Sequence, residues 1–232
     1  MTNDDSRQPR VSDSLDTVEE ALVDLWSVAN TLARIPPPDD RFRVTIFGSA
    51  RVTTGDPQYD DVRRLAARLS ALGCDIITGG GPGLMQAANE GAQIGDPADE
   101  ADSVGIRVAL PFERGANPFV EKVYTHRTFF TRLHHFVRMS DAFIVMPGGL
   151  GTTLEVMMVW QLLQVRHLDG VPLILVGSMW RELVHWAERW MVDHVPPYAN
   201  PEDIKIPRCV NTAEEAAAII ETMVPAKPQE GR

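Results

Sequence analysis

Three short glycine-rich segments contain the residues that could do chemistry in this sequence. Residues 48–51, 79–83 and 147–152 each follow an apolar run of strand length and lead into a helical pattern. Glycine permits positive φ and a close approach of a ligand, and free N–H groups at a helix N-terminus attract an anion. Tight turns alone could explain one such loop, but three in one sheet favour a phosphate ligand. The predicted contacts are Ser49, Gly81, Gly148, Gly149, Gly151 and Thr152.

The standard nucleotide-binding motifs do not fit these loops. A dinucleotide fingerprint spaced from Gly79 and Gly81 would need glycine at position 84, where the sequence has Leu84. A P-loop needs Gly-Lys-Ser/Thr, which does not occur in the chain. Neither NAD binding nor hydrolysis of a nucleoside triphosphate follows from the loops, and no cofactor is predicted.

Alternating strand and helix patterns position the loops. The predicted strands are 44–47, 75–78, 104–109, 122–125, 142–146, 171–175 and 207–210. The predicted helices are 58–72, one from residue 83 through 92, 128–139, 151–166, 178–194 and one from residue 212. Apolar strands separated by helices predict a parallel sheet covered on both faces, an α/β Rossmann-like doubly wound fold. Ligands of such sheets bind at the carboxyl ends of the strands, where all three loops fall.

The domain organisation follows from where this alternation begins and ends. Residues 1–40 are predicted to form a disordered lead and an amphipathic helical arm, with an apolar stripe from Leu15 to Leu32 that prolines 36–38 terminate. Residues 41–223 form the single predicted nucleotide-binding domain, and residues 224–232 a flexible tail. The arm is expected to pack on the core or on a second subunit.

Composition excludes several classes of protein. The 232 residues are 44% hydrophobic and 23% charged with a net charge of −10, which is typical of a soluble domain and unsuited to binding a nucleic-acid backbone. No apolar run approaches the length of a membrane span, and the polar start lacks the core of a signal peptide. Two cysteines set no disulfide framework, so a cytoplasmic location is expected.

Residues 147–155 identify a family. They match the motif PGGxGTxxE and resemble the Lonely Guy-like family of cytokinin riboside 5′-monophosphate phosphoribohydrolases, often mislabelled lysine decarboxylases. Residues 79–85 resemble the family's second glycine loop and residues 48–51 its first, so the resemblance covers about residues 43–177 and is closest to the longer bacterial branch. It implies a hydrolase of nucleoside 5′-monophosphates with a role in cytokinin biosynthesis and a dimeric habit.

The resemblance also implies site residues. The family's catalytic pair falls on Arg132 and Glu155, and a substrate-binding glutamate falls on Glu113. One position departs from the family, because Leu133 stands where a lysine commonly follows the arginine. Met85, predicted to contact substrate, begins the helix after the second loop. Without the motif, we would interpret Glu155 as a favourable charge at a helix N-terminus and Arg132 as a structural ion pair or a solvated residue.

The chemistry of this pair suits cleavage of an N-glycosidic bond. Such cleavage develops an oxocarbenium-like sugar, which a carboxylate can stabilise while it activates water. A phosphate held at the start of the helix that carries Glu155 would fix the ribose against it, and Arg132 would bind the phosphate or a hydroxyl. Met85 and Asn89 could line the base pocket and the Phe129-Phe130 pair could close it, although a methionine or an aromatic residue on a helix is more often part of the core.

The predicted function is hydrolysis of AMP or N6-modified AMP to free base and ribose 5-phosphate. The alternative is a non-catalytic carrier or sensor of the same fold that binds a nucleotide or a molybdenum-cofactor-like ligand. Pyridoxal chemistry is rejected because the three lysines, Lys122, Lys205 and Lys227, lie away from the loops. The histidines show no metal-ligand spacing, so no metal is predicted. The expected partners are a small nucleotide and further copies of the chain, with no nucleic acid and no membrane.

Overall fold

The computed structural model describes residues 41–98, 100–109 and 115–225. The predicted arm over residues 1–40 and the last residues of the predicted tail lie outside this range. The described residues contain a seven-stranded sheet. Its strands are β1 (Arg43–Phe47), β2 (Asp75–Thr78), β3 (Ser103–Val108), β4 (Lys122–His126), β5 (Ala142–Val145), β6 (Leu173–Val176) and β7 (Pro207–Val210).

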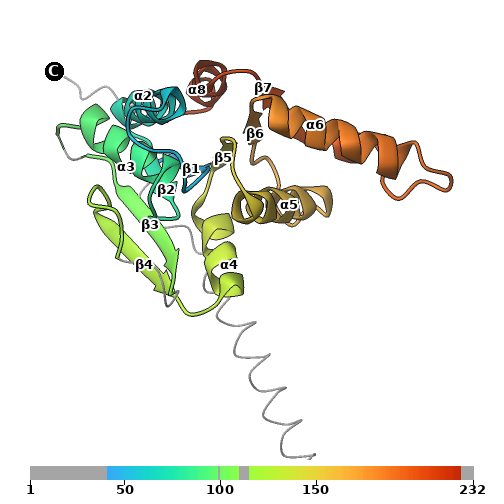
Figure 1. Cartoon of the computed structure of the whole chain (residues 1–232), viewed down its shortest axis with the longest axis horizontal. Coiled ribbons are helices and arrows are strands. Elements are labelled where there is room, and N and C mark those ends of the chain that lie inside the picture. The colour runs from blue at the N-terminus through green and yellow to red at the C-terminus, as the bar shows by residue number, and fades with distance from the viewer. Residues whose placement is uncertain (1–40, 99, 110–114, 226–232) are drawn as a thin grey trace, which may run out of the picture. The chain divides into compact units, whose positions relative to one another are not determined.

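The strand order reverses at the centre of the sheet. The order is β4-β3-β2-β1-β5-β6-β7, and each neighbouring pair is parallel. Val44 of β1 pairs with Ile76 on one side and with Ala142 on the other. The chain therefore builds outward from β1 to β4 and then returns to the opposite side of β1 (Figure 1). The predicted doubly wound fold is confirmed, and its switch point lies between β1 and β5.

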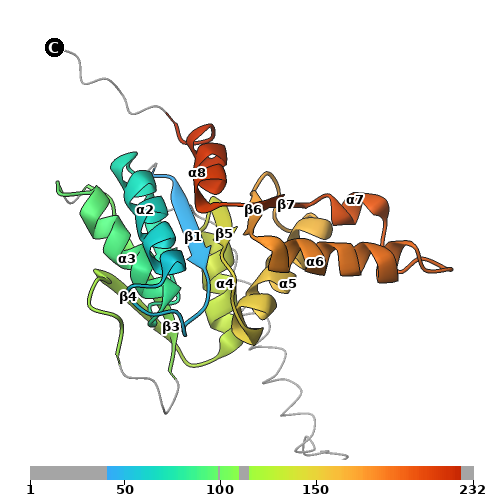
Figure 2. The ribbon, with the colours of Figure 1, turned by 45° about the horizontal axis from the view of Figure 1, so that its top comes forward.

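Helices cover both faces of the sheet (Figure 2). They are α2 (Pro57–Ala71), α3 (Leu84–Gly95), α4 (Phe129–Met139), α5 (Leu150–Gln164), α6 (Ser178–Ala187), the π-helix η1 (Glu188–Val192), α7 (Pro201–Ile204) and α8 (Ala213–Glu221). Helices α2, α3 and α8 share one buried cluster with Val44 and Ile46 of β1. Helices α4, α5 and α6 share another with Phe47 of the same strand. This alternation along β1 is the two-residue period of a strand buried on both faces.

Polar caps and close backbone contacts fix the helices that bear on the site. The Asp56 side chain accepts from the Gln58 N–H at the start of α2, and Thr128 caps α4 in the same manner. A Cβ on Gly91 of α3 would lie 2.2 Å from the Arg63 carbonyl oxygen of α2. Glycine at this position therefore allows α2 and α3 to pack backbone against backbone.

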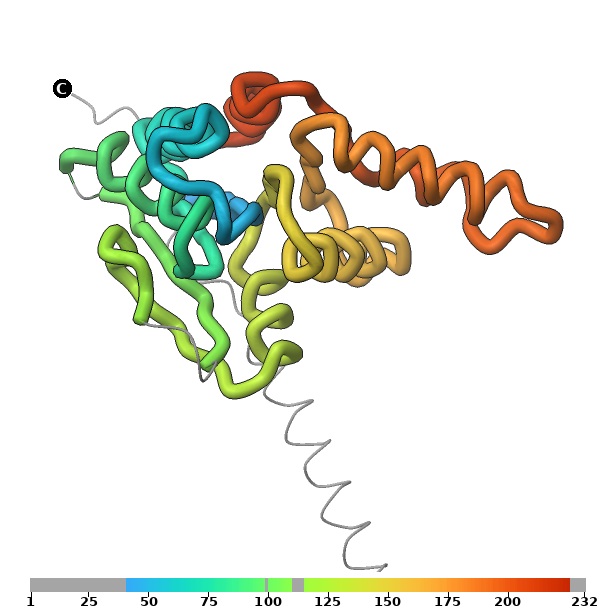
Figure 3. Tube along the Cα trace, viewed as in Figure 1, coloured from blue at the N-terminus to red at the C-terminus, as the bar shows by residue number. Residues whose placement is uncertain are grey.

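The structure differs from the predicted elements at three places. Strand β4 is mostly exposed rather than apolar and buried, because it is an edge strand paired only with β3. The predicted helix over 178–194 is α-helical only to Ala187 and continues as the π-helix η1, which extends away from the sheet (Figure 3). The short helix α7 was not predicted. None of the helices in the described residues is long and apolar enough to cross a membrane.

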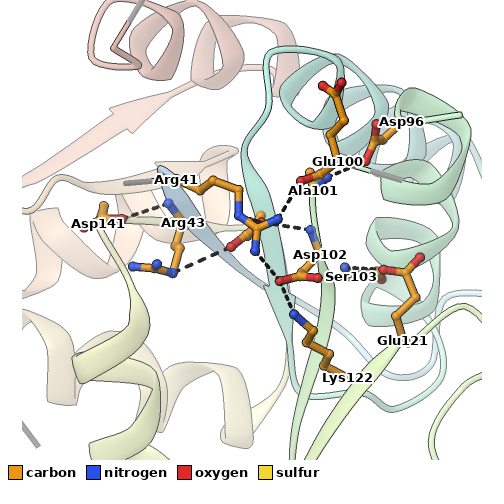
Figure 4. A network of polar contacts seen from close by, with 11 residues as sticks. Arg41, Arg43, Asp96, Glu100, Ala101, Asp102, Ser103, Glu121, Lys122 and Asp141 are labelled. Carbon is orange, nitrogen blue, oxygen red and sulfur yellow. Dashed lines mark hydrogen bonds and ion pairs between the residues drawn. The ribbon is translucent and has the colours of Figure 1, made fainter. Parts of the chain in front are cut away.

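The amino ends of the strands carry a network of charged residues (Figure 4). Asp102 accepts from Arg41 Nη2 and from Lys122 Nζ, each at 2.6 Å. The Arg43 N–H donates to the Asp141 carboxylate at 2.8 Å. These contacts join the starts of β1, β3, β4 and β5. Lys122 therefore pairs with a carboxylate at the end of the sheet opposite the glycine loops.

Candidate active site

Backbone hydrogen bonds join the three glycine loops at the carboxyl ends of β1, β2 and β5. The Ser49 N–H donates to the Pro147 carbonyl at 3.1 Å, and the Leu84 N–H donates to the Ser49 carbonyl at 2.9 Å. Gly83 has a φ of +73°, and a Cβ there would lie 2.3 Å from the Ser49 oxygen. The first loop is thus the link between the other two, and all three meet at the switch point.

Arg132 and Glu155 form an ion pair beside these loops. Arg132 Nη1 lies 3.1 Å from Glu155 Oε1, with only 13% and 10% of the two side chains exposed. Arg132 Nε also donates to the Ile106 carbonyl at 2.9 Å, and the guanidinium lies 5.0 Å from the centre of the Phe136 ring. Helix α4 therefore holds the arginine between β3 and the acid on α5. The predicted pair is brought together.

Burial makes Glu155 an acid that titrates near neutral pH. It raises the pKa of the carboxyl from 4.5 to about 7, while the charge and the hydrogen bond of Arg132 act in the opposite direction. Burial and the charge of Arg132 both lower the pKa of nearby His126. A carboxyl that titrates near neutral pH is suited to give and take protons under physiological conditions.

The second glycine loop lies directly under Arg132 and Met85. A Cβ on Gly79 would lie 2.5 Å from Arg132 Nη2 and 2.7 Å from Met85 Sδ. A Cβ on Gly81 would lie 2.8 Å from Met85 Cε. Any side chain at these glycines would displace the two residues that cover them. Gly81 and Met85, both predicted site residues, thus belong to the same cluster as Arg132 and Glu155.

The first and third loops border an open pocket of about 800 Å³. Four predicted phosphate ligands, Ser49, Gly148, Gly149 and Gly151, line it together with residues 50–52, Gln58, Pro147, Leu150 and Met179. Gly149 caps α5 without a side-chain hydrogen bond, and no acidic residue occupies the first turn of that helix. An uncapped helix N-terminus that faces a pocket is suited to bind an anion.

Other predicted residues are placed differently. Thr152 is buried beneath Gly148, where a Cβ would lie 2.3 Å from its hydroxyl oxygen. Asn89 does not line a base pocket: it is fully buried and its amide bonds Thr78, Ser103 and Asn117. That prediction was wrong because Asn89 lies in the second turn of α3 on the side that contacts β2 and β3.

Glu113 and the Phe129-Phe130 pair are the remaining predicted residues. Glu113 lies outside the described residues. Phe130 at the start of α4 is 85% exposed, and Phe129 beside it is half exposed, so neither is core. Within the described part of the chain, no group of three or more His, Cys, Asp or Glu side chains could hold a metal ion.

Sequence reasoning missed a histidine pair next to Arg132. His126 Nε2 lies 2.8 Å from His135 Nδ1, which ties the end of β4 to α4. Burial, together with the charges of His126, Arg138 and His134, lowers the pKa of His135 to about 4. The pair therefore stays neutral near pH 7 and fixes the helix that carries Arg132. A separation of nine residues carries no signal of such a contact.

Curated relatives and solved structures agree with the motif and the fold. A nucleosidase of Escherichia coli K12, named pyrimidine/purine nucleotide 5′-monophosphate nucleosidase, is 34% identical over 126 residues. The match covers 52% of this chain and only 28% of that protein, so the chain spans about a quarter of its length.

Two solved structures share the fold at 17% identity. The molybdenum cofactor binding protein of Rippkaea orientalis has a TM-score of 0.59, with 81% of this chain and 99% of that chain covered. The molybdenum cofactor carrier protein of Chlamydomonas reinhardtii has a TM-score of 0.57, with 78% of this chain and 97% of that chain covered.

Residues 85–220, more than half of the chain, match the family described as "Possible lysine decarboxylase". The chain therefore belongs to that family, the Lonely Guy family, as the motif at residues 147–155 indicates.

Proposed function

We propose that this protein hydrolyses the N-glycosidic bond of a nucleoside 5′-monophosphate, AMP or N6-modified AMP, to free base and ribose 5-phosphate. The observation that carries the proposal is the buried Arg132–Glu155 pair, whose carboxyl titrates near pH 7 beside the loops at the start of α5. The partial match to a nucleotide 5′-monophosphate nucleosidase supports the same reaction class.

The proposed reaction uses the carboxylate form of Glu155. As the bond from C1′ to the base nitrogen lengthens, positive charge develops on the ribose, and a carboxylate in a poorly solvated site stabilises it. The carboxylate takes a proton from water as the water oxygen bonds C1′. The base leaves with the electron pair of the broken bond and gains a proton from solvent, and Glu155 then returns the proton that it took from water to solvent. Arg132 keeps part of the Glu155 population ionised despite its burial.

The phosphate positions the ribose for this step. The N-terminus of α5 faces the pocket, and Glu155 follows in the same helix within two turns. A nucleotide held at its 5′-phosphate by Gly149 and Gly151 would carry its sugar toward the carboxylate. The binding energy of the phosphate would then hold C1′ of the ribose in place beside the Glu155 carboxylate.

A non-catalytic carrier or sensor is the alternative function. Proteins that bind or carry the molybdenum cofactor share this fold, at sequence identities that support a common architecture only. A binding protein has no need of a buried carboxylate paired to an arginine, because such a pair is costly to desolvate. The pair therefore favours the enzyme.

Release of ribose 5-phosphate from AMP tests the proposal. Purified protein should release it from AMP or another purine or pyrimidine monophosphate in a panel that includes N6-isopentenyl-AMP. Glu155→Gln should lower turnover by about 10² to 10⁴-fold and keep nucleotide binding. Glu214→Gln, the same change at an exposed position of α8, is the matched control and should leave turnover unchanged. Nucleotides that bind without being cleaved would favour the carrier.

We also propose a cytoplasmic homo-oligomer, at least a dimer. Several large apolar side chains of the described surface are at least half exposed: Phe130, Leu150, Trp190, Val195 and Tyr198. Exposed apolar groups of this size are typical of an interface between subunits, and two-fold pairs are the commonest assembly. Light scattering at micromolar concentration should give at least twice the mass of the chain, and a monomer mass would contradict the proposal.

A further inference from the structure

A buried network of side-chain amides and hydroxyls lies behind the second glycine loop. Asn89 Oδ1 accepts from Thr78 Oγ1 at 2.7 Å and from Asn117 Nδ2 at 3.0 Å. Asn89 Nδ2 donates to Ser103 Oγ at 2.9 Å. Asn89 and Asn117 are 0% and 9% exposed. Because both oxygen and nitrogen of the Asn89 amide are engaged, the amide has one orientation, and it fixes that of Asn117.

Asn117 holds the loop by two consecutive carbonyl groups. Its backbone N–H donates to the Gly80 carbonyl at 2.9 Å, and its Nδ2 donates to the Gly81 carbonyl at 3.0 Å. Its Oδ1 accepts from the Phe119 N–H at 3.1 Å, so the side chain is anchored on both sides. The loop is therefore clamped from the side of the network.

This clamp determines where the Gly81 N–H points. In a planar trans peptide the carbonyl and the following N–H point in opposite directions. Since Asn117 holds the Gly80 carbonyl, the Gly81 N–H points away from Asn117. The next peptide offers no second donor, because residue 82 is proline. Of the peptide groups Gly80–Gly81 and Gly81–Pro82, only the first has an N–H group, and this N–H points away from Asn117.

The Gly81 N–H has no acceptor among the described residues. Gly81 is buried, and none of the hydrogen bonds in the described part of the chain uses its N–H. A buried backbone donor without a partner is rare and costs free energy. The residues beside the loop are Met85 and Arg132, which is paired to Glu155. An oxygen supplied by a ligand would satisfy the donor.

We propose that Asn117 is a positioning residue that aims the Gly81 N–H at an oxygen of the ribose 5-phosphate part of the bound nucleotide. The inference rests on the proposed function, because the reacting sugar must lie near Glu155 and therefore near the second loop. Asparagine is required at position 117 because its side chain must donate to Gly81 and Asn89 and accept from Phe119 at once. Aspartate could only accept.

Nuclear magnetic resonance of protein labelled with ¹⁵N-glycine tests the contact directly. The chain has 17 glycines, and the Gly81 signal is assigned by its loss in Gly81→Ala. AMP and ribose 5-phosphate should each shift the Gly81 amide proton downfield, whereas adenine should not. Shifts of Gly149 and Gly151 with an unmoved Gly81 would overturn the inference and leave the proposed function intact. Shifts of Gly81 without hydrolysis of AMP would refute only the proposed function, and no shift of any glycine would refute both.

Asn117→Asp tests the positioning role. The second carboxylate oxygen would face the Gly81 carbonyl and Asn89 Oδ1, and the Kd for AMP should rise by about tenfold, the loss of one hydrogen bond. The matched control is Thr45→Val, which removes the buried hydrogen bond between Thr45 and Ser140 at 2.5 Å. At comparable losses in unfolding free energy, only Asn117→Asp should weaken AMP binding and abolish the Gly81 shift. Equal effects of both variants on the Kd for AMP would overturn the positioning role of Asn117. If a variant fails to fold, the Gly81 amide shift in the unsubstituted protein decides whether the contact exists.

Discussion

Glu155→Gln should make the protein inactive and should gain stability relative to the unsubstituted protein as the pH rises from 5 to 8. The carboxyl pKa is 4.5 in the unfolded chain and about 7 in the folded protein, because burial opposes ionisation more than Arg132 favours it. That difference corresponds to about 3 kcal/mol between the protonated and ionised forms. Glutamine has the shape of the protonated acid and does not ionise, so it removes this cost.

The sign of the pH dependence follows from proton binding. Between pH 4.5 and 7 the folded protein binds more protons at Glu155 than the unfolded chain does, so its stability falls as the pH rises through this range. The glutamine side chain of the variant does not titrate and has no such slope. The free energy of unfolding of the variant minus that of the unsubstituted protein should therefore increase from pH 5 to pH 8, by up to about 3 kcal/mol, and then level off.

Urea denaturation at pH 5, 6, 7 and 8 measures this difference. The attraction between Arg132 and the Glu155 carboxylate is already part of the raised pKa, and any change in packing on substitution is independent of pH, so the slope and not the absolute value is diagnostic. Glu214→Gln is the internal control. Hydrogen bonds from its own backbone and from Thr212 lower the pKa of Glu214 from 4.5, so its titration lies mostly below the measured range and the difference for that variant should be almost flat from pH 5 to 8. A flat difference for Glu155→Gln would refute the buried-acid reasoning.

Three further outcomes are expected. Arg132→Ala should weaken both AMP binding and turnover, because it removes a proposed ligand of the nucleotide and the partner of Glu155. Calorimetry measures the binding and initial rates measure the turnover, and unchanged binding would contradict the prediction. Adenosine should be cleaved far more slowly than AMP at equal concentration, and equal rates would overturn phosphate anchoring. Gly79→Ala should lower turnover in initial-rate measurements, since its Cβ would displace the Arg132 guanidinium that is paired to Glu155. Gly91→Ala, its control, should cost about 1–3 kcal/mol of stability in urea because its Cβ meets the backbone of α2.

The sequence predicted the positions of the buried strands and of both edge strands closely, but not the exposure of the edge strand β4. The runs at β1, β2 and β5 are buried on both faces and are followed by glycine or proline within two residues, so the local sequence indicates both their type and their limits. Strand β4 is mostly exposed, so its own residues do not indicate a buried strand. It is held in the sheet by pairing with β3, whose residues lie earlier in the chain. The π-helical end of α6 likewise has no local sequence signal.

The candidate site was predictable in its parts and not in its connections. Local patterns place the loops at strand ends, and the family motif selects Arg132 and Glu155, which the residues alone would leave as structural charges. The structure adds their 3.1 Å contact and the raised pKa, both consequences of packing between α4 and α5. The Asn89–Asn117 contact joins residues 28 positions apart, so neither periodicity nor spacing could reveal it.

The glycines of the loops serve two different physical purposes. A Cβ on Gly149 or Gly151 would meet nothing within 4 Å, so these positions face open space at the α5 N-terminus, where a ligand has room. A Cβ on Gly79 would displace Arg132, whose charge and hydrogen bond lower the pKa of Glu155 and so oppose the effect of burial on it. Gly149 and Gly151 of the third loop therefore leave room for the proposed phosphate, whereas Gly79 of the second loop makes room for the protein's own arginine. Since the first loop joins both by hydrogen bonds, the backbone proposed to bind the phosphate and the loop beside the acid belong to one hydrogen-bonded unit.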